Sequence, residues 1–171
     1  MLKQAGDIPL IAAPELESLG FSEDIDLYRQ FTGAAHIASR NVISTEIGAR
    51  SIGAYALTVP ALVNLFQDSF AGGVNTLVIH GFPYSGDYFG TTWPGYTPFN
   101  YEFTDMWGPR SPSWRHINDT LLYAARNTLL GKLGVAKVDL AFYSFGVPFP
   151  HRRVYAGEDL NTAGKFIPKP T

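Results

Sequence analysis

Apolar residues recur at helical spacing in three separate stretches of the chain. This spacing is typical of helices that bury one face against a core. Each stretch begins near a residue whose side chain can cap a helix, and the second and third end at glycines. The predicted helices therefore cover residues 22–39, 58–71 and 113–133, with Ser22, Thr58 and Ser113 as their capping residues.

Three shorter runs, residues 41–45, 74–79 and 137–143, are dense in β-branched or other apolar residues and predict buried strands. Glu46 directly follows the first run and His80 follows the second, so polar groups stand at strand ends, and we expect the two side chains to converge at the C-terminal edge of the sheet. Almost continuously apolar strands that alternate with helices indicate an α/β fold with parallel pairing. We expect the three strands to lie parallel and adjacent in this order, with helices on the outer face.

The sheet could be open or part of a barrel, and two features favour the barrel. The candidate polar groups follow strand ends, where (β/α)8 barrels hold their active sites, and three strands are fewer than the eight that a barrel needs. We predict a partial (β/α)8 barrel of about three parallel strand–helix units with irregular N- and C-terminal segments. Residues 1–145 would form the barrel segment and residues 146–171, rich in proline and glycine, an irregular tail.

The composition excludes several classes of function. The chain has 171 residues with 13 Lys+Arg against 15 Asp+Glu, so it has no excess of positive charge with which to bind nucleic acid. It contains no cysteine, which excludes disulfides and thiolate metal sites. No stretch reaches 18 consecutive apolar residues, and the start lacks the pattern of a signal peptide, so we expect no membrane partner.

The residues after position 79 combine glycines and aromatic side chains with few charges, which suits a neutral, flat-faced polar ligand such as a sugar. His80 could donate a hydrogen bond to a sugar hydroxyl, or neighbouring backbone could satisfy it instead. Some of the aromatic residues must belong to the core. The candidates for contact with a sugar are His80, Tyr84, Trp93, Tyr96 and Trp107.

Several motifs resemble those of a known family. They are AAPELESLGF at residues 12–21, ISTEIGA at 43–49, FAGGVN at 70–75, YSG at 84–86 and WPGY at 93–96. In this order they resemble fungal secreted proteins related to glycoside hydrolase family 106, the α-L-rhamnosidases, over residues 12–143. The resemblance implies a segment of a (β/α)8 catalytic domain, an extracellular location, and a longer parent chain that supplies the remaining barrel segment.

The resemblance also implies chemistry. In that family a strand-terminal glutamate among small residues is catalytic, the anomeric centre is inverted, and a calcium ion can assist sugar binding. Glu46 occupies the matching position; its alternative role is to cap an amide or pair with Arg50. Asp87 and Asp105 could bind a hard cation, although Asp87 also suits a turn.

Inversion requires two carboxyl groups roughly 6.5 to 9.5 Å apart. The earlier half of the barrel, which should supply the second one, has no counterpart in these residues. Glu15 and Glu17 lie in a proline-containing loop before the first helix and are further candidates for substrate binding at the same rim. Two hypotheses follow: a glycoside hydrolase, or a fragment of one, that hydrolyses α-L-rhamnosides or related sugars with inversion, and a non-catalytic carbohydrate-binding or structural remnant of such a barrel.

Overall fold

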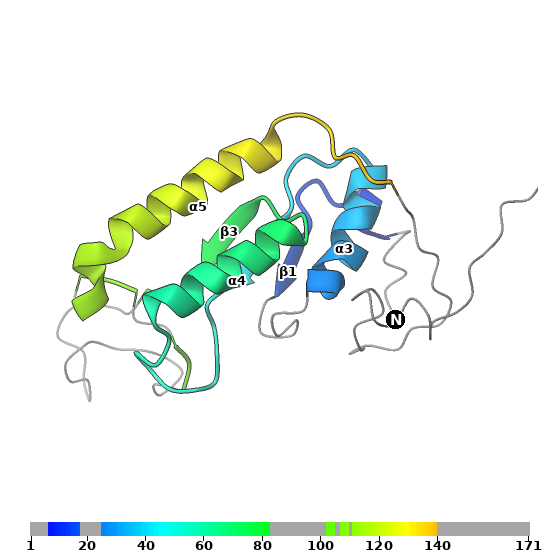
Figure 1. The fold of residues 1–171 in the computed structure, drawn as a ribbon. Coiled ribbons are helices and arrows are strands. Elements are labelled where there is room, and N and C mark those ends of the chain that lie inside the picture. Colours follow the sequence, from blue (N-terminus) through cyan, green and yellow to red (C-terminus); the bar gives the residue numbers. More distant parts are fainter. Residues whose placement is uncertain (1–6, 18–24, 83–101, 105–106, 110, 140–171) are drawn as a thin grey trace, which may run out of the picture.

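The computed structural model describes residues 7–17, 25–82, 102–104, 107–109 and 111–139 (Figure 1). These residues form a parallel sheet whose strands alternate with helices along the chain. The strands are β1 (Glu15–Glu17), β2 (Ser44–Ile47) and β3 (Thr76–Ile79); the helices are α3 (Ile25–Ile37), α4 (Val59–Ala71) and α5 (Ile117–Lys132), with short 3₁₀ helices η1 (Ile8–Leu10) and η2 (Pro112–His116).

The sheet has the order β1-β2-β3, and both pairings are parallel. In the register of the strands, Glu17 stands beside Glu46, and Glu46 stands beside Val78. The predicted α/β class and the parallel, adjacent arrangement of the strands near residues 41–45 and 74–79 are therefore confirmed. The arrangement agrees with that of a partial barrel.

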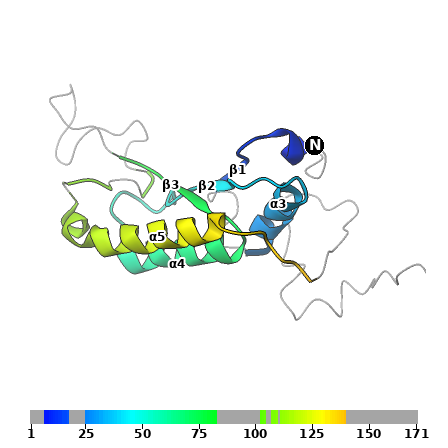
Figure 2. The ribbon, with the colours of Figure 1, turned by 90° about the horizontal axis from the view of Figure 1, so that it is seen from above.

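Helices α3, α4 and α5 cover one face of the sheet (Figure 2). Alternate strand residues face them: Leu16 packs in a cluster with Tyr28 of α3, and Ile47 packs with Leu62 and Phe66 of α4. Because side chains alternate between faces along a strand, the residues between them occupy the opposite face. That face has the side chains of Glu15, Ser44 and Thr76 in one row and those of Glu17, Glu46 and Val78 in the next.

Helix α4 begins and ends as the sequence predicts. The hydroxyl of Thr58 accepts a hydrogen bond from the backbone N–H of Ala61 at 3.4 Å, and a proline lies in the first turn. At the other end, Gly73 has φ +93°, a conformation that favours glycine, and it turns the chain directly toward β3.

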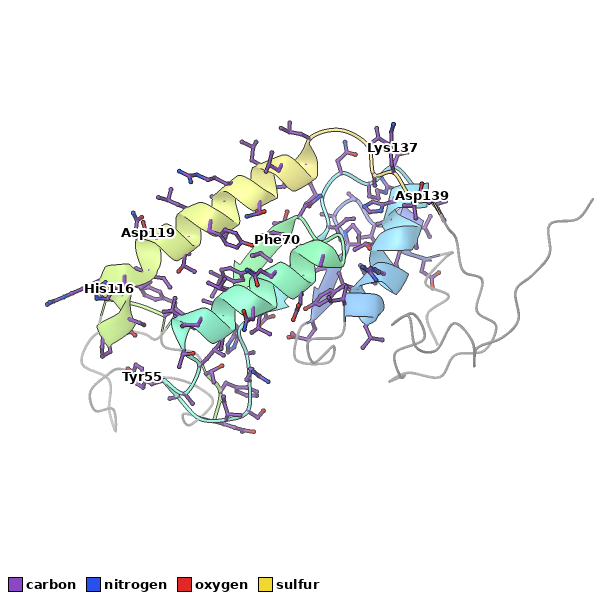
Figure 3. The ribbon with its side chains drawn as sticks, in the orientation of Figure 1. Tyr55, Phe70, His116, Asp119, Lys137 and Asp139 are labelled. Atoms are coloured by element: carbon purple, nitrogen blue, oxygen red, sulfur yellow. The ribbon has the colours of Figure 1, made fainter. Side chains whose placement is uncertain are left out.

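Helices α4 and α5 lie side by side over β2 and β3 (Figures 1 and 2). Phe70 of α4 lies between the two helices (Figure 3), and its ring meets that of Tyr123 edge to face with centroids 6.4 Å apart. Ala124 and Ile117 complete the buried face of α5. This packing holds the ends of β2 and β3 together.

Two predicted elements are wrong in the described residues. Residues 135–139 are exposed and irregular, so the third predicted strand does not begin at residue 137; residues 140–143 lie outside the described part. Ser113 does not cap α5, because it lies in η2 and its hydroxyl is 2.7 Å from that of Ser111. Ser22, the predicted cap of α3, lies outside the described residues.

Strand β1, at one edge of the sheet, comes from a segment that we expected to be a loop. Residues 15–17 form β1, with Leu16 buried and a glutamate exposed on each side. A single buried residue over three positions is too short a pattern to distinguish a strand from a loop by alternation. Pro14, directly before β1, also favours a loop, although proline is tolerated at the start of a strand.

Candidate functional site

Glu46 is the third residue of β2, the central strand, on the face opposite the helices. Its side chain is 34% exposed. Ile47 beside it points into the core and is fully buried, so the backbone at this position is held by packing on the other face. The sheet thus presents the Glu46 carboxyl near the C-terminal end of its central strand, where (β/α)8 enzymes place their catalytic groups.

His80 follows the last residue of β3, and its backbone N–H donates to the carbonyl of Ile47 at 2.9 Å. This bond continues the pairing of the two strands by one residue. The imidazole Nε2 lies 3.9 Å from Oε1 of Glu46, and the ring meets Phe103 edge to face at a centroid distance of 6.0 Å. The structure therefore brings Glu46 and His80 together, as their positions at neighbouring strand ends led us to expect.

The surroundings of Glu46 raise the pKa of its carboxyl group above the ordinary value. Burial is the largest cause, because it disfavours the charged form; the negative charge of Glu17 comes next. His80 acts in the opposite direction, and the more distant Glu15 adds to the increase. A carboxyl group that keeps its proton closer to neutral pH has the property that a general acid requires.

Arg50 is not among the charged groups that shift the pKa of Glu46. The alternative in which Glu46 pairs with Arg50 stays a hypothesis. The backbone N–H of Arg50 donates to the hydroxyl of Thr104 at 3.0 Å.

Glu15 and Glu17 lie on β1, not in a loop as the sequence suggested. Glu15 accepts a hydrogen bond from the hydroxyl of Ser44 at 2.7 Å. It stands two residues before Glu17, one row of side chains further from the C-terminal edge of the sheet. Glu17 is in register with Glu46 on the neighbouring strand, and its negative charge is the second cause, after burial, of the raised pKa of Glu46.

Residues that are distant in sequence from β2 and β3 bind the turns beside His80 and complete the rim of the site, which is the C-terminal edge of the sheet. The hydroxyl of Thr104 donates to the carbonyl of Gly48, and the backbone N–H of Trp107 donates to the carbonyl of Gly81 at 3.2 Å. These bonds attach Thr104 and Trp107 to the turns that follow β2 and β3. The rim is thus built from three separate parts of the chain.

Trp107 is only 9% exposed and packs in the same cluster as Ile47. Its indole Nε1 is buried and has no hydrogen-bond partner among the described residues. A Cβ placed on Gly48 would lie 3.6 Å from this nitrogen, so the indole N–H is next to the turn after β2. Trp107 thus packs mainly in the core, and little of its side chain is available for contact with a sugar.

The other predicted sugar contacts, Tyr84, Trp93 and Tyr96, lie outside the described residues, as do Asp87 and Asp105. Calcium takes six to eight oxygen ligands. Within the described part of the chain, no group of three or more His, Asp or Glu side chains could hold a metal ion. The described residues therefore do not fit a calcium site, and the binding of calcium stays a prediction.

Sequence reasoning missed the pairing of Glu17 with Glu46 and the contact of Phe103 with His80. The first was missed because β1 was not recognised; the alternation in Glu15-Leu16-Glu17 was its only signal. The second joins residues that are far apart in the chain and has no local signal.

Comparison with known proteins gives one informative likeness. No protein-family model matches the chain, and no curated protein matches it. The solved structure of a rhamnosidase from Novosphingobium sp. PP1Y is similar over 72% of this chain, with 20% sequence identity and a TM-score of 0.53. The matching part is 12% of that chain.

At this level of identity the likeness concerns the fold. The described chain has a mixed α/β, rhamnosidase-like fold with a three-stranded parallel sheet. None of the helices in the described ranges is long and apolar enough to cross a membrane.

Proposed function

We propose that this chain is a segment of a glycoside hydrolase that cleaves α-L-rhamnosides or related sugars with inversion, and that Glu46 is its general acid. One observation supports this most strongly. A half-buried carboxyl with a raised pKa stands near the C-terminal end of the central strand, beside His80, in a fold similar to that of a rhamnosidase.

In this proposal the protonated carboxyl of Glu46 donates its proton to the glycosidic oxygen. The electron pair of the breaking bond between the anomeric carbon and that oxygen stays with the oxygen, which leaves as a hydroxyl group. A water molecule attacks the anomeric carbon from the opposite face and loses its proton to a second carboxylate. His80, 3.9 Å from Glu46, would donate a hydrogen bond to a sugar hydroxyl.

The second carboxylate and the remaining strands would come from another barrel segment in a longer parent chain. Residues 1–145 would form part of the catalytic domain and residues 146–171 an irregular tail. The motifs at 43–49, 70–75 and 93–96 support a relation to fungal secreted proteins of the glycoside hydrolase family 106 type, and with it an extracellular location. Calcium would assist sugar binding there, with ligands other than the described residues.

A second candidate is a non-catalytic carbohydrate-binding or structural remnant. It is favoured by the size of the sheet: three strands are described, whereas a closed barrel needs eight, and the chain matches 12% of the rhamnosidase it resembles. Such a remnant would keep His80 and the rim but would lack the second carboxylate.

The test is the substitution Glu46→Gln, assayed with an aryl α-L-rhamnoside on the full chain and on any longer protein that contains it. The amide keeps the shape of the side chain but has no acidic proton, so we expect turnover to fall by about 10²-fold or more while binding of L-rhamnose, followed by calorimetry, stays within a few-fold. Glu102→Gln, on an exposed loop, is the matched control. Turnover that is unchanged in Glu46→Gln would contradict the assignment; binding without any turnover in the unsubstituted protein would favour the remnant.

A further inference from the structure

We propose that Glu17 is a positioning residue that keeps the proton on Glu46 and so makes Glu46 the acid, and not the base, of the reaction. This inference rests on the proposed function for its consequence, but its physical content can be measured without a substrate. It concerns a residue that the sequence suggested only as a sugar contact.

The first support is the register of the sheet. Glu17 and Glu46 are partners on neighbouring parallel strands, and the alternation of side chains along a strand puts both on the face opposite the helices. Neighbouring strands are about 4.8 Å apart, so two side chains in register on one face are direct cross-strand neighbours. The pairing of the backbones therefore places the two glutamates side by side.

The second support is the electrostatic effect of this arrangement. Two ionised carboxylates on neighbouring strands would place two negative charges next to each other, so Glu17 disfavours the ionised form of Glu46 and raises the pKa of its carboxyl group. Burial acts on Glu46 in the same direction, and Glu46 is the less exposed of the two side chains.

Two other titratable groups face Glu46 and must be weighed. His80 lies 3.9 Å away on the β3 side and favours the ionised form of Glu46 when it is protonated. Glu15 acts in the same direction as Glu17 but more weakly, since it is one row further down β1 and is bound to the hydroxyl of Ser44. The pKa of Glu46 remains raised with all three groups present, so burial and Glu17 outweigh His80.

The experiment is a carbon-13 NMR titration of the Glu46 carboxyl group in the ligand-free full chain. In Glu17→Gln we expect the midpoint to fall by about one pH unit, because the like charge is removed and the amide can donate a hydrogen bond to the ionised carboxylate. Glu15→Gln, on the same strand and face, is the matched control and should shift the midpoint less. His80→Gln should move it in the opposite direction, upward.

Glu17→Thr repeats the test with a residue that favours strands, in case the amide disturbs the edge strand. A midpoint that is the same in both Glu17 variants as in the unsubstituted chain, or that rises, would overturn the inference. A midpoint that falls while the aryl rhamnoside assay is negative confirms the coupling, and only the proposed function fails. If the protein is active, the basic limb of its pH–rate profile should move to lower pH in Glu17→Gln, a change that a merely structural role would not cause.

Discussion

At the scale of the residue, the carboxyl group of Glu46 is held where its ionisation is unfavourable. Ile43 and Ile47, on the face of the sheet that packs against the helices, are fully buried and fix the position of Glu46 in the chain between them. The neighbouring Glu17 adds a second negative charge beside the Glu46 carboxyl group. Natural proteins tolerate such unfavourable groups mainly at functional sites. The same feature makes a prediction about stability that is independent of any substrate.

The folded-state pKa of Glu46 is raised, so the folded protein binds this proton more tightly than the unfolded chain does. The stabilisation that results is fully present below the ordinary glutamate pKa and is lost as the pH rises through the raised value. Glu46→Gln, which is neutral at every pH, should therefore raise the melting temperature at pH 7 and change it little at pH 4. The control Glu102→Gln should show no such difference between the two pH values. If the Glu46→Gln protein melts at a lower temperature than the unsubstituted protein at pH 7, the ionised carboxyl group of Glu46 does not destabilise the fold, and the prediction is wrong.

At the scale of the element, the contact between α3 and the end of α4 depends on a missing side chain. Gly72 is buried against Tyr28, and the hydroxyl of Thr32 donates to the carbonyl of Gly72 at 2.7 Å. A Cβ on Gly72 would lie 2.3 Å from the Cβ of Tyr28, a distance that only a shift of the backbone could relieve. The backbone of Gly72 itself is helical, so the requirement is one of space and not of conformation.

Gly72→Ala should therefore destabilise the protein by about 3 kcal/mol, since overpacked backbone contacts cannot relax by rotamer changes alone. Gly33→Ala is the matched control: it lies inside α3, a Cβ there meets nothing within 4 Å, and alanine should stabilise the helix by about 0.5 to 1 kcal/mol. Urea unfolding of the two variants measures both effects. Equal stability of the two would show that α3 and α4 do not pack as described.

Elements with strong local signals could be predicted from the sequence, and those defined by distant contacts could not. The cap at Thr58, the apolar stripe of α4 and its end at Gly72 and Gly73 are all local, and they predicted that helix closely. Strand β1 has only three residues and gains its stability from pairing with β2, which is a contact between residues 29 apart in the chain. The prediction that a strand begins at residue 137 was wrong for a related reason: residues 137–139 have no partner strand in the described part of the chain.

The candidate site shows the same division. The positions of Glu46 and His80 after apolar runs predicted that they would meet at one edge of the sheet, because carboxyl ends of parallel strands lie together. The role of Glu17 and the rim made by Thr104 required knowledge of which segments pair. Neither follows from spacing along the chain.

At the scale of the whole molecule, the described structure leaves apolar surface uncovered. Val78 is 47% exposed on the face of the sheet opposite the helices, and the last turns of α5 expose further leucines. In a closed barrel, the inner face of the sheet meets the other strands and each helix meets its neighbours in the outer ring. Surface of this kind promotes association when nothing covers it. The exposed leucines of α5 are Leu122, Leu129 and Leu130, and Leu133 follows at its end.

We therefore expect the chain on its own to associate at micromolar concentration and to unfold with a low, poorly cooperative transition. Light scattering coupled to size-exclusion chromatography measures the first, and thermal unfolding followed by near-ultraviolet circular dichroism measures the second. Glu substitutions at Leu129 and Leu133 should reduce association without lowering the melting temperature, because both side chains are already exposed, at 60% and 65%. The matched substitution Leu62→Glu, at a fully buried position, should instead abolish folding. A monomer with a cooperative transition at high temperature would show that these residues form a complete domain, and the proposal of a barrel segment that needs a further segment would then be wrong.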